Sequence, residues 1–190
     1  LLEHIHADSF GIYECPYPYK RVLSPELLKW CADTGKFAFL KDTCCDLDQL
    51  KAKCEAVKGT SLKIFNANAA TLLESMRYGV AGYSGVMANF HADLYAWLVE
   101  HFNDADKQDK VEQMMAFLGA TSMVECQIYP VNCKYHMNLE GVPMSLVTRT
   151  RDPQELLMGK KVNEGLPSSK LLEIQQFKAC EDMFRKAFFG

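Results

Sequence analysis

Residues 37–59 read FAFLKDTCCDLDQLKAKCEAVKG and hold one complete repeat of the pattern that runs through the first half of this chain. The apolar run FAFL predicts a buried strand, and Asp46 is a typical N-cap for the helix that follows. That helix is predicted to end near Gly59, because glycine tolerates the left-handed conformation found at helix C-termini. The strand ends on Lys41, which is either a lysine solvated at a strand end or an amine placed where chemistry occurs.

The same order of strand and helix occurs four times between residues 10 and 103. The other strands are predicted at 10–13, 62–66 and 81–89, and the other helices after Ser24, around Leu72 and across 92–102. The strands are apolar throughout instead of alternating, which is typical of a parallel sheet buried on both faces. A doubly wound open sheet and a (β/α)8 barrel both fit this order. No glycine-rich phosphate loop follows the first strand, which disfavours a dinucleotide-binding sheet. A complete barrel needs eight such units.

Beyond residue 103 the pattern changes to helices. Helices are predicted at 109–120, around 129–141 and after Pro167, with a polar loop that contains a short helical turn at 147–167. No strand is expected between 106 and 190. The last helix carries an apolar stripe at spacings of three and four residues, which indicates a packing surface. The stripe consists of Leu171, Ile174, Phe177, Cys180, Phe184 and Phe188. The sequence therefore predicts barrel-type units over residues 1–103 and a C-terminal helical extension over residues 104–190.

The composition is that of a globular protein, with 48% hydrophobic and 24% charged residues. The net charge of −3 and the absence of Lys/Arg runs argue against a nucleic-acid or anionic-membrane partner. No apolar run approaches the roughly 20 residues of a membrane span. The eight cysteines form no CxxC pair and no signal peptide is evident, so reduced thiols in a cytoplasmic, metal-free protein are expected. The chain starts with Leu, and LLEHIHADS at 1–9 resembles the tail of a helix, so it is expected to begin partway through a larger protein.

Reactive side chains of barrels and open α/β sheets gather at the carboxyl ends of the strands. Tyr13 ends the first predicted strand, Lys41 the second and Ser84 the fourth. A lysine partly withdrawn from water has a lowered pKa, and its neutral amine can attack a ketone to form a Schiff base. A tyrosine on the neighbouring strand is suited to relay the protons. The alternative for Tyr13 is a core aromatic whose hydroxyl bonds to backbone.

Four stretches resemble the dihydrodipicolinate synthase and N-acetylneuraminate lyase superfamily. They are IYECP at 12–16, FLKDTCCD at 39–46, GVAGYSGVMAN at 79–89 and YPVNCKYHMNLEG at 129–141. They are similar to the family's strand-five tyrosine motif, its strand-six Schiff-base motif, its strand-eight glycine-rich motif and its C-terminal helical segment. The resemblance implies an α/β fold, a (β/α)8 TIM barrel, of which this chain carries the last four βα units plus a C-terminal helical segment.

The resemblance implies a class I aldolase or lyase that condenses or releases pyruvate, or another 2-keto acid, with a small aldehyde. Lys41 would be the Schiff-base lysine and Tyr13 the proton relay, while Thr43 and Ser84 would bind substrate. The family's chemistry implies no metal and no other cofactor. Family precedent implies a homodimer or homotetramer.

Two departures from the family pattern bear on the substrate. Dihydrodipicolinate synthases usually carry an arginine five residues after the motif tyrosine; here that position is Pro18, and the nearest basic residues are Lys20 and Arg21. Sialic acid lyases typically have acidic residues where this chain has Asn68 and Ala69. These departures favour an enzyme similar to a 2-keto-3-deoxy acid aldolase. The alternatives are dihydrodipicolinate synthase itself and a catalytically inactive barrel homologue with a binding or assembly role.

Overall fold

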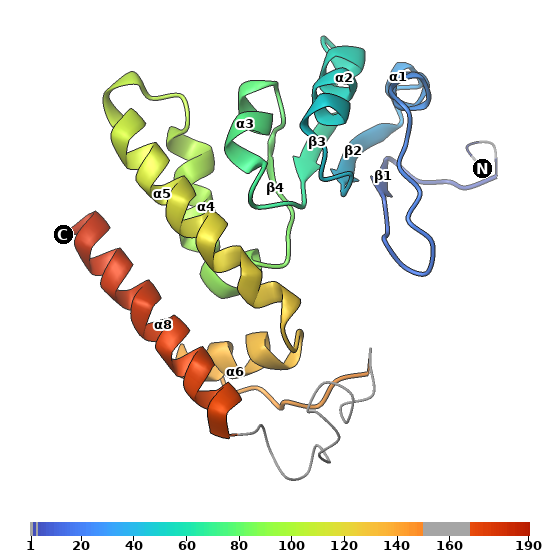
Figure 1. Cartoon of the computed structure of the whole chain (residues 1–190). Coiled ribbons are helices and arrows are strands. Elements are labelled where there is room, and N and C mark those ends of the chain that lie inside the picture. Colours follow the sequence, from blue (N-terminus) through green and yellow to red (C-terminus); the bar gives the residue numbers. More distant parts are fainter. Residues whose placement is uncertain (1, 3, 150–167) are drawn as a thin grey trace. The chain divides into compact units, whose positions relative to one another are not determined.

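Four parallel strands lie side by side in the order β1-β2-β3-β4, and each is followed by a helix (Figure 1). The structure is a computed structural model, which describes residue 2, residues 4–149 and residues 168–190. The strands are β1 (Phe10–Tyr13), β2 (Phe37–Asp42), β3 (Lys63–Asn66) and β4 (Gly82–Tyr83). The helices are α1 (Pro25–Asp33), α2 (Leu47–Val57), α3 (Leu72–Arg77) and α4 (Ala88–His101). All neighbouring pairs are parallel, so the predicted α/β order of four consecutive strand–helix units is confirmed.

Local capping signals set the ends of the first two helices. The Ser24 side chain accepts a hydrogen bond from the Leu27 N–H (3.3 Å), and Asp46 accepts from the Gln49 N–H (3.0 Å). After α2 the chain turns at Gly59, whose φ of 80° lies in the left-handed region. The helix boundaries read from the sequence are therefore correct at these positions.

One face of the sheet packs against helices. Ile12, Leu40 and Ile64 on this face pack with the apolar sides of α1 and α2. The opposite face is more open, with Tyr13 51% and Phe39 42% exposed. The expectation that both faces are buried is therefore wrong for these residues, because α1 and α2 supply apolar partners to one face only.

The chain forms two compact units, which are described separately. Unit 1 comprises residues 1–88 and 92–118, and unit 2 comprises residues 89–91 and 119–190. Unit 1 contains the sheet, the 3-10 turn η1 (Ala105–Lys107) and most of α5 (Gln108–Thr121). Unit 2 contains η2 (Ser122–Cys126), α6 (Val131–Leu139) and α8 (Ser168–Phe189). Its core includes Ile128, Val131 and Ile174.

The helical character of the second half matches the prediction. The described parts of residues 104–190 contain no strand. Residues 4–9 are not helical, so the predicted helix tail is wrong there. Most of the predicted polar loop at 147–167 lies outside the described residues, and the domain division at residue 103 stays a prediction. In the part of the chain that the structure describes, no helix has the length and apolarity to cross a bilayer.

Candidate active site

Tyr13 and Lys41 lie side by side at the carboxyl edge of the sheet. They are register partners in the β1–β2 pair, and Lys41 is in turn the partner of Phe65 in β3. Partnered residues of parallel strands leave the same face of a sheet, so all three side chains occupy the more open face. The Lys41 Nζ lies 4.7 Å from the centroid of the Tyr13 ring. The structure thus brings together the two side chains to which the sequence assigned chemistry.

The Tyr13 hydroxyl belongs to a half-exposed side chain. Partial burial, assisted by the neighbouring Cys15, raises the pKa of Tyr13 above its usual value. The phenol therefore keeps its proton at neutral pH and can donate it. A protonated phenol beside an amine can act as proton donor while the amine acts as nucleophile.

Thr43 and Ser84 occupy different places on this edge. Thr43 directly follows β2, and its nearly buried hydroxyl donates to the Glu14 carbonyl oxygen (2.6 Å). Ser84 directly follows β4, and its N–H donates to the Asn66 carbonyl oxygen (2.8 Å). Since β3 separates β4 from β2, Ser84 lies two strands from Lys41. Thr43 is adjacent to the Tyr13–Lys41 pair, and Ser84 borders the same edge farther along.

Three charged residues near this pair were not identified from the sequence. Glu14 and Asp42 directly follow Tyr13 and Lys41, and Lys53 of α2 forms ion pairs with both of them. All three side chains are fully buried. One signal was available: Lys53 stands three residues after the buried Leu50, on the helix face that packs against the sheet. A lysine at a core-facing position of a helix indicates a buried acidic partner.

Three of the cysteines carry thiols of low reactivity. All eight are free thiols. Burial, with a hydrogen bond to Asp42, raises the pKa of Cys44 to about 12. Burial also raises the pKa of Cys54 and of Cys133 to about 11. These three thiols stay protonated at neutral pH, and thiols in that state are poor nucleophiles and poor metal ligands.

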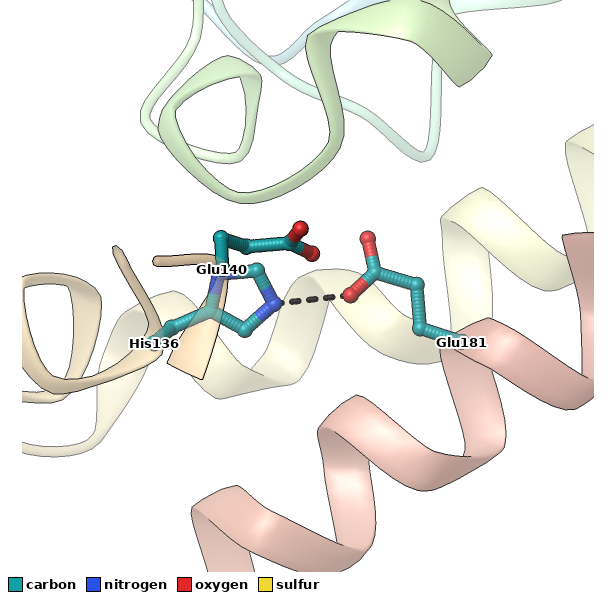
Figure 2. A group of neighbouring side chains, drawn as sticks. All are labelled: His136, Glu140 and Glu181. Atoms are coloured by element: carbon teal, nitrogen blue, oxygen red, sulfur yellow. Dashed lines mark hydrogen bonds and ion pairs between the residues drawn. The ribbon is translucent and has the colours of Figure 1, made fainter. Parts of the chain in front are cut away.

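Unit 2 holds a cluster with the spacing of a metal site. Among the described residues, the ligand atoms of His136, Glu140 and Glu181 lie within 4.8 Å of one another (Figure 2). The His136 Nε2 is 2.7 Å from Glu181 Oε2, and the His91 Nδ1 is 3.2 Å from Glu181 Oε1. The side chains of Glu181 and both histidines are fully buried.

Cationic side chains already neutralise the carboxylates of this cluster. The Arg185 Nη2 lies 2.9 Å from Glu181 Oε1, and the Lys178 Nζ lies 3.2 Å from Glu140 Oε1. Burial opposes ionisation of Glu181, but hydrogen bonds from the two histidines outweigh it and lower the pKa of this carboxyl to about 2. The charges of the cluster are thus balanced by cationic side chains of the protein itself, as in a structural ion-pair network. The expected absence of a metal stays a prediction.

Comparison with known proteins identifies one family. The model of the dihydrodipicolinate synthetase family matches residues 8–163. This range contains β1 to β4 and the Tyr13–Lys41 pair. No curated protein sequence matches the chain.

Solved structures share the fold at low sequence identity. A monomeric dihydrodipicolinate synthase variant has a TM-score of 0.73 and 16% identity, over 95% of this chain and 56% of that chain. YagE, a prophage protein of E. coli K12 solved with pyruvate, has a TM-score of 0.69 and 20% identity, over 90% of this chain and 56% of its own. Dihydrodipicolinate synthase from Bacillus anthracis has a TM-score of 0.74 and 13% identity, over 90% and 54% of the two chains. This chain therefore spans little more than half the length of these proteins.

Proposed function

Because this chain belongs to the dihydrodipicolinate synthetase family, we propose that it carries the Schiff-base site of a pyruvate-dependent lyase or synthase. The observation that supports this most directly is the Lys41 Nζ 4.7 Å from the Tyr13 ring at the carboxyl edge of the sheet. A nucleophilic amine needs a nearby group that gives and takes protons, and the phenol of Tyr13 is the group placed beside Lys41. The reaction requires no metal or other cofactor.

In the proposed reaction the neutral amine of Lys41 attacks the keto carbon of pyruvate. Tyr13 passes a proton to the carbinolamine oxygen, which leaves as water and yields the imine. Loss of a proton from the methyl carbon gives an enamine, which adds to a small aldehyde; the reverse sequence releases pyruvate from a longer 2-keto acid. Water then hydrolyses the imine and restores Lys41. Pro18, Asn68 and Ala69, which stand where related enzymes carry charged residues, favour an activity similar to that of a 2-keto-3-deoxy acid aldolase.

Thr43 and Ser84 are the proposed substrate-binding residues. The Thr43 hydroxyl gives its proton to the Glu14 carbonyl, so its oxygen has a remaining lone pair for a donor from the substrate. Ser84 is partly buried at the same edge of the sheet, after β4. Both positions are compatible with a ligand held above Lys41.

We further propose that β1 to β4 are the last four strands of a (β/α)8 barrel. The sheet ends in two edge strands, β1 and β4, and its open face carries Tyr13 and Phe39. A hollow of about 600 Å³, lined by Phe65, Tyr95 and Val99 among others, lies beside β4. Four further strands would pair with both edges and cover the apolar side chains of this face. The protein that results would be a cytoplasmic homodimer or homotetramer, by analogy with the family.

Dihydrodipicolinate synthase activity is a second candidate. The Lys20 Nζ lies 3.5 Å from the Cys44 carbonyl oxygen, so the loop after β1 brings a cation next to the loop after Lys41. A cation here suits an acceptor aldehyde that carries a carboxylate. The two candidates differ in the acceptor: a carboxylated aldehyde should be preferred only if Lys20 binds it.

Trapping of the imine tests the proposal. The full-length protein that carries this chain is incubated with pyruvate and borohydride, and the adduct is mapped by mass spectrometry. It is expected on the peptide of residues 37–51, which contains Lys41. Lys41→Arg keeps the charge but cannot form an imine, so trapping should be lost. The matched control is Lys63→Arg, at the amino end of β3 and away from the carboxyl edge of the sheet. This variant should form the adduct at the wild-type level.

Two outcomes would contradict this assignment. Trapping by Lys41→Arg at the wild-type level would show that Lys41 is not the nucleophile. A wild-type protein that forms no adduct would favour the inactive homologue with a binding or assembly role.

A further inference from the structure

A buried ion-pair network lies directly behind Tyr13 and Lys41. Glu14 follows Tyr13 and Asp42 follows Lys41, and successive side chains along a strand leave opposite faces of a sheet. The two carboxylates therefore lie on the face covered by helices, where Lys53 of α2 meets them. All three charged side chains are fully buried.

Every oxygen of the two carboxylates has a donor within the chain. The Lys53 Nζ lies 2.7 Å from Glu14 Oε1 and also donates to Asp42 Oδ2. The Glu14 Oε2 accepts the N–H of Thr43 (3.0 Å). The Asp42 Oδ1 accepts the N–H of Cys44 (2.9 Å). The network thus holds the first two backbone amides after β2.

Glu14 also fixes the end of β1. Its Oε1 accepts the N–H of Leu23 (2.9 Å), so the loop after β1 is anchored where it returns towards α1. Its own N–H donates to the Lys41 carbonyl (3.2 Å), and its carbonyl accepts the Thr43 hydroxyl (2.6 Å). One glutamate therefore connects the ends of both strands that carry the proposed reacting groups.

This network contributes little to the stability of the core. The desolvation of buried charges offsets most of their mutual attraction, and apolar residues of similar volume often stabilise a protein as well or better. Burial opposes the charge of Lys53, but hydrogen bonds and charges of Asp42 and Glu14 outweigh it and raise the pKa of this lysine, so it stays an ammonium. A buried network with every polar atom satisfied does, however, specify one geometry. The role of this network is therefore to fix the backbone that follows β1 and β2.

We propose that Glu14, Asp42 and Lys53 are positioning residues for the reaction at Lys41. They hold the backbone immediately after Tyr13 and Lys41 and so keep the phenol and the amine in register. Their side chains face away from the reacting groups, and they act only through these two neighbours. The inference rests on the proposed function. A misplacement of about 1 Å in a reacting group can lower a rate about 10²-fold.

The test uses variants of the full-length protein with matched charge changes. Lys53→Met removes the buried cation, and Lys53→Arg keeps it. Asp42→Asn removes one charge but keeps an acceptor for the Cys44 N–H. The control is Lys58→Met, which removes the lysine of an exposed pair with Glu55, where the side chains are 74% and 61% exposed.

Two measurements separate positioning from mere stability. In folded Lys53→Met the rate of borohydride-trapped imine should fall about 10²-fold, with the pyruvate concentration for half-saturation changed by less than about threefold. Lys53→Arg should recover most of the rate, and Lys58→Met should match the wild type. In Asp42→Asn, hydrogen exchange at the amide of Cys44 should be faster by roughly tenfold or more, because a neutral side-chain amide oxygen is a weaker acceptor than the Asp42 carboxylate.

Asp42→Asn decides the outcome if Lys53→Met fails to fold. A folded Asp42→Asn with wild-type trapping rate and wild-type exchange at Cys44 would overturn the inference. A wild-type protein that traps no pyruvate would instead refute the proposed function, whatever the exchange rates of the variants show. The two failures are therefore distinguishable.

Discussion

The hydroxyl of Tyr13 is the proposed proton relay, and a single substitution isolates it. Tyr13→Phe keeps the ring that lies beside Lys41 and removes only the hydroxyl group. Turnover should fall by about 10²- to 10⁴-fold, the range for loss of a general acid–base group, while pyruvate binding changes little. Steady-state kinetics of the full-length protein measure both quantities.

The control for Tyr13→Phe is a tyrosine outside the proposed site. Tyr19 is 77% exposed on the loop after β1. Tyr19→Phe should therefore leave turnover at the wild-type level. Equal activity of the two variants would show that the Tyr13 hydroxyl moves no proton in the slow step.

The packing of helix α8 is predicted to depend on the buried carboxylate of Glu181. Glu181 of α8 is bonded to His136 of α6 and to His91, and its pKa is lowered to about 2. Because the pKa of this carboxyl is lower in the folded state, the ionised Glu181 stabilises the fold at pH values above its unfolded-state pKa of about 4.5. This contribution is lost as the pH falls towards 2. Glu181→Gln should therefore reduce the free energy of unfolding by about 3 kcal/mol at pH 7.

Denaturant unfolding at several pH values checks the prediction for Glu181. The difference between the wild type and Glu181→Gln should shrink as the pH is lowered from about 4.5 towards 2. Glu173→Gln is the matched control, because Glu173 forms a partly exposed pair with Lys170 on the same helix. Its effect should stay below about 1 kcal/mol. Equal effects of the two substitutions on the free energy of unfolding would contradict the predicted stabilising role of Glu181.

At the scale of the molecule, the sheet has two edges and one open apolar face. Edge strands with unpaired N–H and C=O groups promote association between chains. The 190-residue chain alone should therefore self-associate, whereas a protein with the proposed eight strands should be monodisperse. Size-exclusion chromatography with light scattering distinguishes the two states. A stable, monodisperse monomer of the 190-residue chain would contradict the half-barrel.

A substitution on the open face tests the same architecture. Phe39 is 42% exposed and packs edge-to-face with Phe65, at 6.3 Å between ring centroids. Phe39→Lys should reduce self-association of the isolated chain, because it places a charge on the apolar face. In the proposed eight-stranded barrel the same lysine would be buried, and we expect loss of stability by several kcal/mol. Leu172→Lys, on an exposed position of α8, is the control.

The local pattern of the sequence determined the order of strands and helices. Ser24, Asp46 and Gly59 act on neighbouring backbone groups, so their effect is readable without tertiary structure. The position of Tyr13 beside Lys41 was also predictable, because the carboxyl ends of parallel strands meet at one edge.

The partners of buried charges were decided only by the tertiary structure. Lys53 meets Glu14 across 39 residues of sequence, and Glu181 meets His91 across 90. Such pairs depend on how helices pack against the sheet or against one another, and no local periodicity encodes that packing. The exposure of Phe39 has the same origin: its apolar character comes from the sequence, but whether another layer covers it depends on the assembled fold.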